Sequence, residues 1–369
     1  MLPGTRWRLR FGGLDDAYGP RQPGKWTGET VKVDIALRSY QLSAAADAAA
    51  DLEALGYDGV WTAEVAHDPF LPIPLIAAAT SRVSMGTGIA VAFARTPMSL
   101  AYLGSDLQTL SGGRFILGLG SQVKAHITRR FSMPWSQPAA RMREMVLAIR
   151  AIWASFETGE KLNFEGEFYR HTLMNEEFSP GPAPFGWPPI FVAGVGARMA
   201  ETAGEVADGL LLHSFTTERY LSEVTLPAVE RGLARSGRDR RDFTIVCQPF
   251  VVTGATEAGV AETKDWVRRR VAWYGSTPAY RPVLDVHGWA DLGAELHGLS
   301  RSDLPDRLEK MLELVPDEVL NTFAVVAEPG DLVAALIAKF GTCADRLRLN
   351  PTVLAPGMAP EAIRLLHGA

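Results

Sequence analysis

The chain has 369 residues, of which 47% are apolar and 21% charged, so it is long enough to bury one large core or two medium ones. A net charge of −5 with no block of Lys or Arg gives no sign of a nucleic-acid groove. Two cysteines, Cys247 and Cys343, are too few for a disulfide framework or a zinc finger. No apolar run reaches the roughly 18 residues of a transmembrane helix, so we expect a cytoplasmic protein with no membrane or nucleic-acid partner.

The first 30 residues differ in composition from the rest of the chain. They are rich in Gly, Pro and Arg and follow neither a helical nor a strand period. We expect a flexible leader or surface strap over residues 1–30, followed by a single domain over residues 31–369.

From Val31 onward, short apolar runs alternate with amphipathic helices. The apolar runs are continuous, which is typical of strands that are buried on both faces. The helices carry ordinary boundary residues, such as Pro97 near the start of one helix and Gly112 just beyond its end. The expected strands begin near Val31, Gly59, Val83, Arg114, Pro189, Asp208, Phe243 and Thr322.

Eight strand–helix units in a chain of this length predict a (β/α)8 TIM barrel rather than a doubly wound sheet. Two insertions interrupt the alternation. A hairpin with a proline-rich loop is expected over about 159–188, before strand five, and a second insertion over about 275–300, before strand eight. Insertions of this kind often contribute to a substrate pocket, although many are inert.

In a TIM barrel the active site lies at the carboxyl ends of the strands. Several chemically useful residues follow the expected strands there. They are Glu64 after strand two, Thr87, Gly88 and Ile89 after strand three, Ser121 and Gln122 after strand four, Gly194, Val195, Gly196 and Ala197 after strand five, and His213 after strand six. The seven histidines are scattered, with no spacing typical of metal ligands, so we expect no metal site.

The sequence "PPIFVAGVGARMAETAGEVADG" carries the strongest local signal. A buried strand leads into Gly194-Val195-Gly196, and a helix opens at Ala197. Glycines at that point let a phosphate approach the backbone, and the first helical N–H groups favour an anion. The glycines could equally serve only a tight turn between strand and helix.

The stretch "LSGGRFILGLGSQ" has a Gly-x-Gly pair but lacks the third glycine and the acidic residue of a dinucleotide fingerprint. We interpret Gly118 and Gly120 as positions in strand four where a larger side chain would crowd a ligand at the barrel mouth.

Glu64 ends a strand and is suited to proton transfer or to hydrogen bonding with a ring, although an ion pair or a helix cap would also explain it. His126 follows strand four and is our second candidate for proton transfer, although histidines in such positions are more often structural.

Five segments together resemble the luciferase-like monooxygenase superfamily, and specifically its branch that uses coenzyme F420, a deazaflavin. They are "GYDGVWTAE", "MGTGIAVAFARTP", "LSGGRFILGLGSQVKAH", "FEGEFYR" and "VAGVGARMAETAGEVADG". The resemblance covers roughly residues 31–340.

The resemblance implies a coenzyme across the carboxyl mouth of the barrel and hydride transfer to or from a small organic substrate. It maps a non-prolyl cis peptide that supports the coenzyme's ring onto Gly88–Ile89, and the phosphate loop onto Gly194–Ala197. Superfamily members are often dimers, so it also implies a homodimer.

The chain departs from the sugar-phosphate dehydrogenases of this family. Those enzymes carry Asp-His at the end of strand two, where this chain has Glu64-Val65, and a Glu after strand four, where it has Ser121-Gln122-Val123. The resemblance therefore argues against oxidation of a sugar phosphate. Two alternatives stay open: a monooxygenase that uses flavin mononucleotide (FMN), and a protein that binds a flavin or deazaflavin without catalysis.

Overall fold

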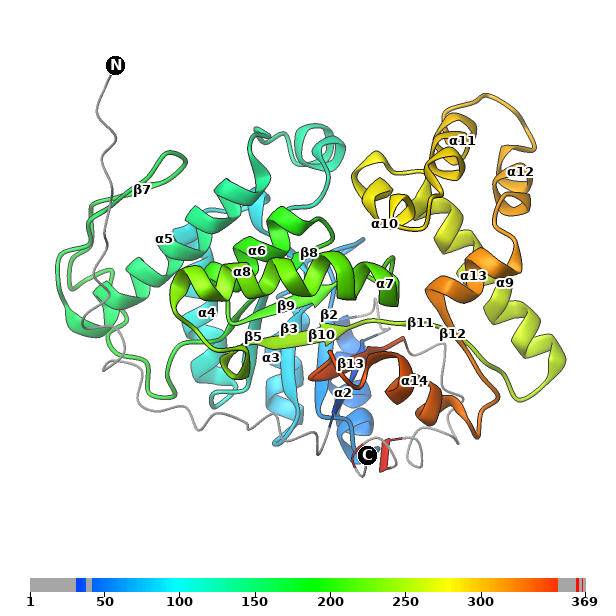
Figure 1. The fold of residues 1–369 in the computed structure, drawn as a ribbon. Helices are drawn as coiled ribbons and strands as arrows, with labels where there is room; N and C mark the ends of the chain where they lie inside the picture. The colour runs from blue at the N-terminus through cyan, green and yellow to red at the C-terminus, as the bar shows by residue number, and fades with distance from the viewer. Residues whose placement is uncertain (1–30, 38–41, 351–362, 365–366, 368–369) are drawn as a thin grey trace, which may run out of the picture.

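The computed structural model describes residues 31–37, 42–350, 363–364 and 367 (Figure 1). The leader expected over residues 1–30 lies outside this range. No helix in the described part of the chain is long and apolar enough to cross a membrane.

Eight parallel strands form a closed barrel. They are β1 (Lys32–Ala36), β2 (Gly59–Thr62), β3 (Ser84–Thr87), β5 (Phe115–Gly120), β8 (Ile190–Gly194), β9 (Gly209–Leu212), β10 (Thr244–Cys247) and β13 (Arg346–Leu349). The strands neighbour one another in the order β3-β2-β1-β13-β10-β9-β8-β5, and the pairing of β3 with β5 closes the ring. A two-residue strand, β4 (Ala90–Val91), continues alongside β5. The predicted TIM barrel is confirmed.

Helices follow most of the strands and cover the outside of the barrel (Figure 1). Local sequence explains where they begin. In α4, for example, Thr96 caps the helix in a reciprocal pair with Ser99, directly before Pro97. The helices packed around the barrel are α2 (Ala45–Ala54), α3 (Pro72–Ala79), α4 (Pro97–Leu110), α5 (Pro138–Thr158), α6 (Ala197–Val206), α7 (Glu218–Tyr220), α8 (Leu226–Ser236) and α14 (Leu332–Phe340), with π-helical turns at His126–Arg130 and Leu221–Thr225.

Seven of the eight expected strand starts fall within one residue of the observed strands. The prediction for strand eight near Thr322 is wrong. The apolar run there forms β12 (Ala324–Val326), which pairs only with β11 (Phe250–Val252) in a small separate sheet. The barrel's eighth strand is β13, which pairs with β1 and β10.

The chain between β10 and β13 forms a helical lobe beside the barrel, at the right of Figure 1. Its helices are α9 (Glu257–Gly275), α10 (Arg281–Asp285), α11 (Ala290–Ser300), α12 (Arg307–Glu313) and α13 (Asp317–Phe323). The lobe has its own hydrophobic cluster, which includes Phe215 and Tyr220 from the barrel side. The other insertion contains a short antiparallel hairpin, β6 (Phe164–Glu165) with β7 (Arg170–His171).

The inside of the barrel is packed in layers. An apolar layer contains Trp61, Ile116, Phe191, Leu211 and Val246. Nearer the amino ends of the strands, the buried Asp34 accepts hydrogen bonds from Trp61 Nε1 at 2.8 Å and from Arg346 Nε at 2.6 Å. The Asp34 and Trp61 layers therefore form the floor of the barrel. The residues one layer further toward the carboxyl ends of the strands form its mouth.

Candidate active site

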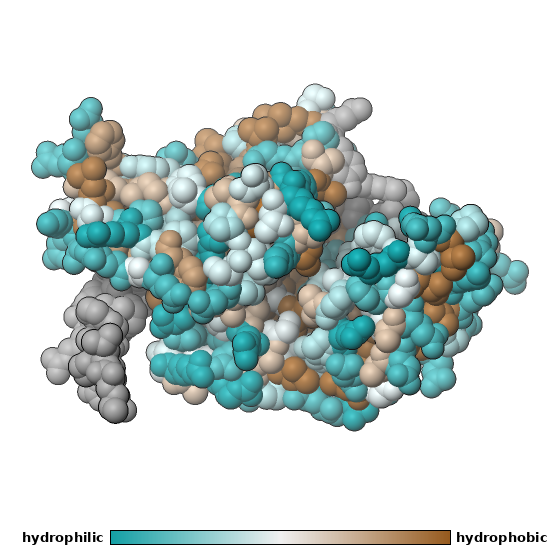
Figure 2. All heavy atoms as spheres, turned by 90° about the horizontal axis from the view of Figure 1, so that it is seen from above, coloured by the Kyte–Doolittle hydropathy of each residue, from teal (hydrophilic) through white to brown (hydrophobic). Residues whose placement is uncertain are grey.

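The mouth of the barrel has one wall of small residues and one polar wall. Small residues occupy the inward positions at the ends of β1, β2, β3, β5 and β8, namely Ala36, Ala63, Gly88, Gly118 and Ala193. Polar side chains lie on the other side: His213 follows β9, Gln248 follows β10, and Arg348 lies on β13. Ala63 is exposed, and Figure 2 shows the molecule hollowed between the barrel and the helical lobe. The layer therefore has small side chains on one side, where protein atoms fill the space beside Gly88 and Gly118, and polar groups on the other.

The wall between β3 and β5 depends on Thr87. The ladder between these strands is interrupted after Gly86 and resumes at Ala90. In this gap the buried Thr87 hydroxyl donates to Gly118 O at 2.7 Å and accepts from Gly118 N at 3.0 Å. Thr87 thus substitutes for the missing backbone pairing. The peptide between Gly88 and Ile89 is cis, as the resemblance implied.

Gly118 and Gly120 make room for protein atoms of the neighbouring strand. A Cβ on Gly118 would lie 1.7 Å from Thr87 O, and one on Gly120 would lie 2.8 Å from the Ile89 side chain. Our interpretation of these glycines as clearance for a ligand is therefore corrected: they admit the backbone and side chains of the β3–β4 segment.

Glu64 lies after β2 with its carboxylate held by protein groups. Its Oε2 accepts from Val91 N and from Arg95 Nη1, both at 2.7 Å. Arg95 also pairs with Asp68 at 2.9 Å. This geometry shows the ion pair that the sequence analysis gave as an alternative. Because both hydrogen bonds go to Oε2, Glu64 Oε1 is left for another partner.

The loop Gly194–Ala197 joins β8 to α6 at the mouth. Gly196 is the N-cap of α6, and no side chain caps the helix. A Cβ on Gly196 would meet no atom within 4 Å, whereas one on Gly194 would lie 2.8 Å from Met199. Gly194 is therefore needed for helix packing, and Gly196 borders open space at an uncapped helix N-terminus. That is the geometry of an anion site.

Three further predicted residues follow β5 or start the turn after it. Ser121 donates to Gln122 O at 3.1 Å, and Gln122 has a left-handed backbone with a φ of 58°. His126 is exposed at the start of the π-helical turn. Ser121 and Gln122 therefore border the mouth, while His126 lies on the surface beyond it.

His213 ends β9 within an aromatic cluster. Its ring lies 4.5 Å from that of Tyr274 and 4.9 Å from that of Tyr280, both from the helical lobe. Its Nδ1 accepts a hydrogen bond from Phe215 N at 3.0 Å, which places the ring proton on Nε2. Burial, together with the charge of Arg348, lowers the pKa of His213 to about 4, so the imidazole is neutral at pH 7.

Arg348 was not among the residues expected from the sequence. It lies on β13, and its Nη1 crosses the barrel to donate to Gly88 O at 3.1 Å, while Nη2 donates to Gln248 Oε1. Its guanidinium lies 5.8 Å from the centre of the Trp61 ring. One sequence signal could have predicted that Arg348 faces into the barrel. It is the alternation in "RLRL" (346–349), in which Leu347 and Leu349 are buried on the outside of the barrel.

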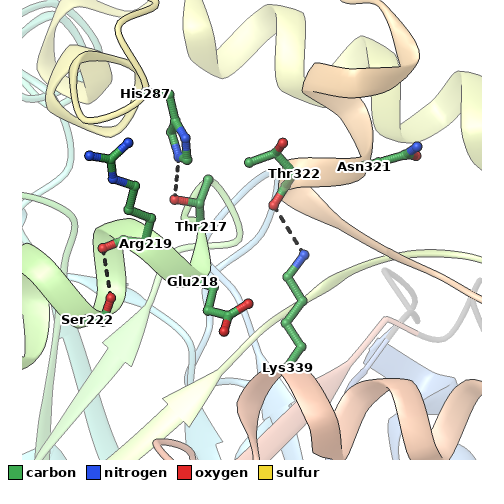
Figure 3. Close-up of a pocket in the computed structure, with 8 residues that line it drawn as sticks. All are labelled: Thr217, Glu218, Arg219, Ser222, His287, Asn321, Thr322 and Lys339. Carbon is green, nitrogen blue, oxygen red and sulfur yellow. Dashed lines mark hydrogen bonds between the residues drawn. The ribbon is translucent and has the colours of Figure 1, made fainter.

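A separate polar cavity of about 420 Å³ lies between α7, the helical lobe and α14 (Figure 3). His287 Nε2 lies 2.8 Å from Thr217 Oγ1 there, and Lys339 Nζ donates to Thr322 O at 3.2 Å. These bonds join the lobe to the barrel. Over the described ranges, no group of three or more His, Cys, Asp or Glu could hold a metal ion.

Comparisons with known proteins place the chain in a family. The family model of the luciferase-like monooxygenases matches residues 26–346. An uncharacterised protein of Mycobacterium tuberculosis is 53% identical over 83% of this chain and 89% of its own length. An F420-dependent glucose-6-phosphate dehydrogenase of Intrasporangium calvum is 32% identical over 76% of this chain and 80% of its own.

Solved structures agree with the fold. The coenzyme F420-dependent tetrahydromethanopterin reductase of Methanopyrus kandleri superposes with a TM-score of 0.72 at 19% identity, over 92% of this chain and 97% of that one. At that identity the likeness bears on the fold alone. Together with the family match over most of the chain, it leads to one conclusion: this protein belongs to the luciferase-like monooxygenase family of enzymes.

Proposed function

We propose that the protein is an oxidoreductase that uses coenzyme F420 for hydride transfer to or from a small organic substrate at the barrel mouth. The observation that carries the proposal is the uncapped N-terminus of α6 beside the open space at Gly196. The F420-dependent relative supports this choice of coenzyme.

The residues present fit a phosphate-bearing coenzyme. The loop Gly194–Ala197 offers backbone N–H groups and the positive end of a ten-residue helix, with no side chain in the way. Ala36, Ala63 and Ala193 carry small side chains above the Trp61 layer, on the side where the resemblance puts the coenzyme's flat ring beside Gly88–Ile89. When bound, the coenzyme supplies a carbon centre that carries hydride in two-electron steps.

The chain's own residues would bind and orient the reactants. Thr87 holds the β3–β5 wall, and Ser121 and Gln122 border it. Glu64 can offer only Oε1 to a ring, since Arg95 and Val91 hold Oε2. We keep Glu64 and His126 as proposed proton-transfer residues. His213, neutral at pH 7, can donate from Nε2.

The test is a fluorescence titration of F420 against the wild type and Gly196→Leu. The wild type should change the emission of the coenzyme, and Gly196→Leu should weaken binding at least tenfold, because a bulky side chain fills the space at the helix N-terminus. Gly298→Leu is the matched control, since a side chain there also meets no atom within 4 Å, but lies on α11. Equal affinity for F420 in the wild type and Gly196→Leu would place the phosphate elsewhere.

Two alternatives are separated by the same preparations. Tight binding of FMN and none of F420 would make the protein an FMN-dependent monooxygenase. Binding of F420 without hydride exchange to any acceptor in a screen at the coenzyme's absorbance would leave a binding role without catalysis. Glucose 6-phosphate belongs in the screen as an expected non-substrate, because Glu64-Val65 replaces the Asp-His pair.

We also propose a homodimer, on the resemblance alone, and a cytoplasmic location, on the sequence features given above. Light scattering coupled to size exclusion checks the mass against the 40.1 kDa chain, and cell fractionation checks the location.

A further inference from the structure

The guanidinium of Arg348 is a positive charge to which the described residues supply no counter-charge. Over residues 31–37 and 42–350, no carboxylate lies within the 4.0 Å of an ion pair with it. The buried carboxylate whose charge acts on Arg348, Asp34, is paired with Arg346 at 2.5 Å. Within the described part of the chain, Arg348 donates to two neutral oxygens, Gly88 O and Gln248 Oε1, and its buried Nε has no hydrogen-bond partner. A half-buried cation in this state favours an anion beside it.

The described neighbours of Arg348 at the mouth add donors and no negative charge. His213 has its proton on Nε2, because Nδ1 accepts from Phe215 N. Gln248 already gives its carbonyl oxygen to Arg348. The lobe contributes Tyr280, and burial raises the pKa of that phenol to about 12, so it stays neutral. The polar wall is therefore electropositive, and its open N–H groups suit an anionic oxygen.

The opposite wall carries small, uncharged side chains. Ala36, Ala63 and Ala193 lie there and Ala63 is exposed to the mouth, whereas Arg348 and Thr87 fill the space beside Gly88 and Gly118. A ligand with an acidic end toward Arg348 and an uncharged body toward the small wall would match both sides. The Gly194–Ala197 loop lies at a different position, after β8, so one anion at α6 and another at Arg348 would occupy separate sites.

We propose that Arg348, with His213, binds the carboxylate of an anionic substrate at the barrel mouth. This inference rests on the proposed function and deepens it: the substrates to be sought are small carboxylic acids. Arg348 supplies the charge, and His213 Nε2 supplies a second hydrogen bond.

The experiment compares benzoate with benzamide, which share a shape and differ in charge, by calorimetric titration. The wild type should bind benzoate at least roughly tenfold more tightly than benzamide, as expected for hydrogen bonds to a charged group. Arg348→Gln should reduce this preference to less than about threefold, and Arg348→Lys should restore part of it. Arg231→Gln, which removes an exposed guanidinium paired with Glu201 on the outer helices, is the control and should keep the full preference.

A second measurement places the ligand. Benzoate should shift the imidazole resonances of His213 in the wild type and not in Arg348→Gln, whose folding is checked by circular dichroism. No preference for benzoate in the wild type, or a preference that survives in Arg348→Gln, would overturn the proposal. Saturating F420 should leave benzoate binding in place; loss of binding through competition would assign the cation to the coenzyme's own acidic groups and would likewise overturn it.

Failure of the proposed function has a different signature. Absence of any F420 binding by fluorescence would refute the coenzyme assignment, while the dependence of benzoate affinity on Arg348 would be unaffected.

Discussion

Replacing Thr87 by valine tests whether its hydroxyl completes the barrel wall. Valine keeps the shape and volume of threonine, so the change removes only Oγ1, which bonds to both Gly118 O and Gly118 N. Both backbone groups would then stay buried without partners, at about 1–3 kcal/mol each, for a loss of about 2–6 kcal/mol in the free energy of unfolding. Guanidinium titration followed by circular dichroism measures this loss.

Thr87→Ser is the matched control. It keeps the hydroxyl and removes one buried methyl group, which costs about 1 kcal/mol. The difference between the two variants isolates the hydrogen bonds. If Thr87→Val were as stable as Thr87→Ser, Gly118 N and O would have hydrogen-bond partners other than the Thr87 hydroxyl. The inference that Thr87 completes the interrupted β3–β5 ladder would then be refuted.

Three further results are expected. Gly118→Ala should lose about 1–3 kcal/mol of unfolding free energy, because its Cβ would lie 1.7 Å from Thr87 O. Gly298→Ala on α11, where a Cβ meets no atom within 4 Å, should gain up to about 1 kcal/mol. Chemical denaturation compares the two variants. Glu64→Gln should cost about 1–3 kcal/mol by removing the buried carboxylate that pairs with Arg95 and leaving that guanidinium only the exposed Asp68. Asp68→Asn, at the exposed end of the same network, should cost under about 1 kcal/mol, and thermal melts compare both variants. The pKa of His213 is lowered from 6.5 to about 4, so the stability that its neutral form contributes is present above pH 6.5 and is lost as the pH falls from 6.5 toward 4. His213→Gln should therefore flatten the fall in melting temperature over that interval. An equal fall in both proteins would contradict the lowered pKa.

Most of the barrel was predictable because its strands are buried on both faces. Continuous apolar runs such as the one in β5 stand out against the amphipathic helices on either side. The turn Gly194–Ala197 between β8 and α6 was also predictable from its glycines, while its binding of a phosphate stays a prediction. The roles of Gly118 and Gly120 could not be inferred in the same way. A glycine in a strand indicates that something approaches closely, but not whether it is a ligand or the neighbouring strand.

The error at strand eight and the omission of Arg348 have the same physical cause. The inward face of β13 carries Arg346 and Arg348, so its four residues alternate charged and apolar and are typical of a half-exposed strand. Arg346 is nevertheless buried, because Asp34 on β1 neutralises it from a position 312 residues away in the chain. Sequence reasoning assigned strand eight to the more apolar run at β12 and so left β13 out of the barrel. Only the closed ring shows that two arginines face inward. One is paired at the floor, and the one at the mouth has no counter-charge among the described residues, which is why we propose to seek acidic substrates.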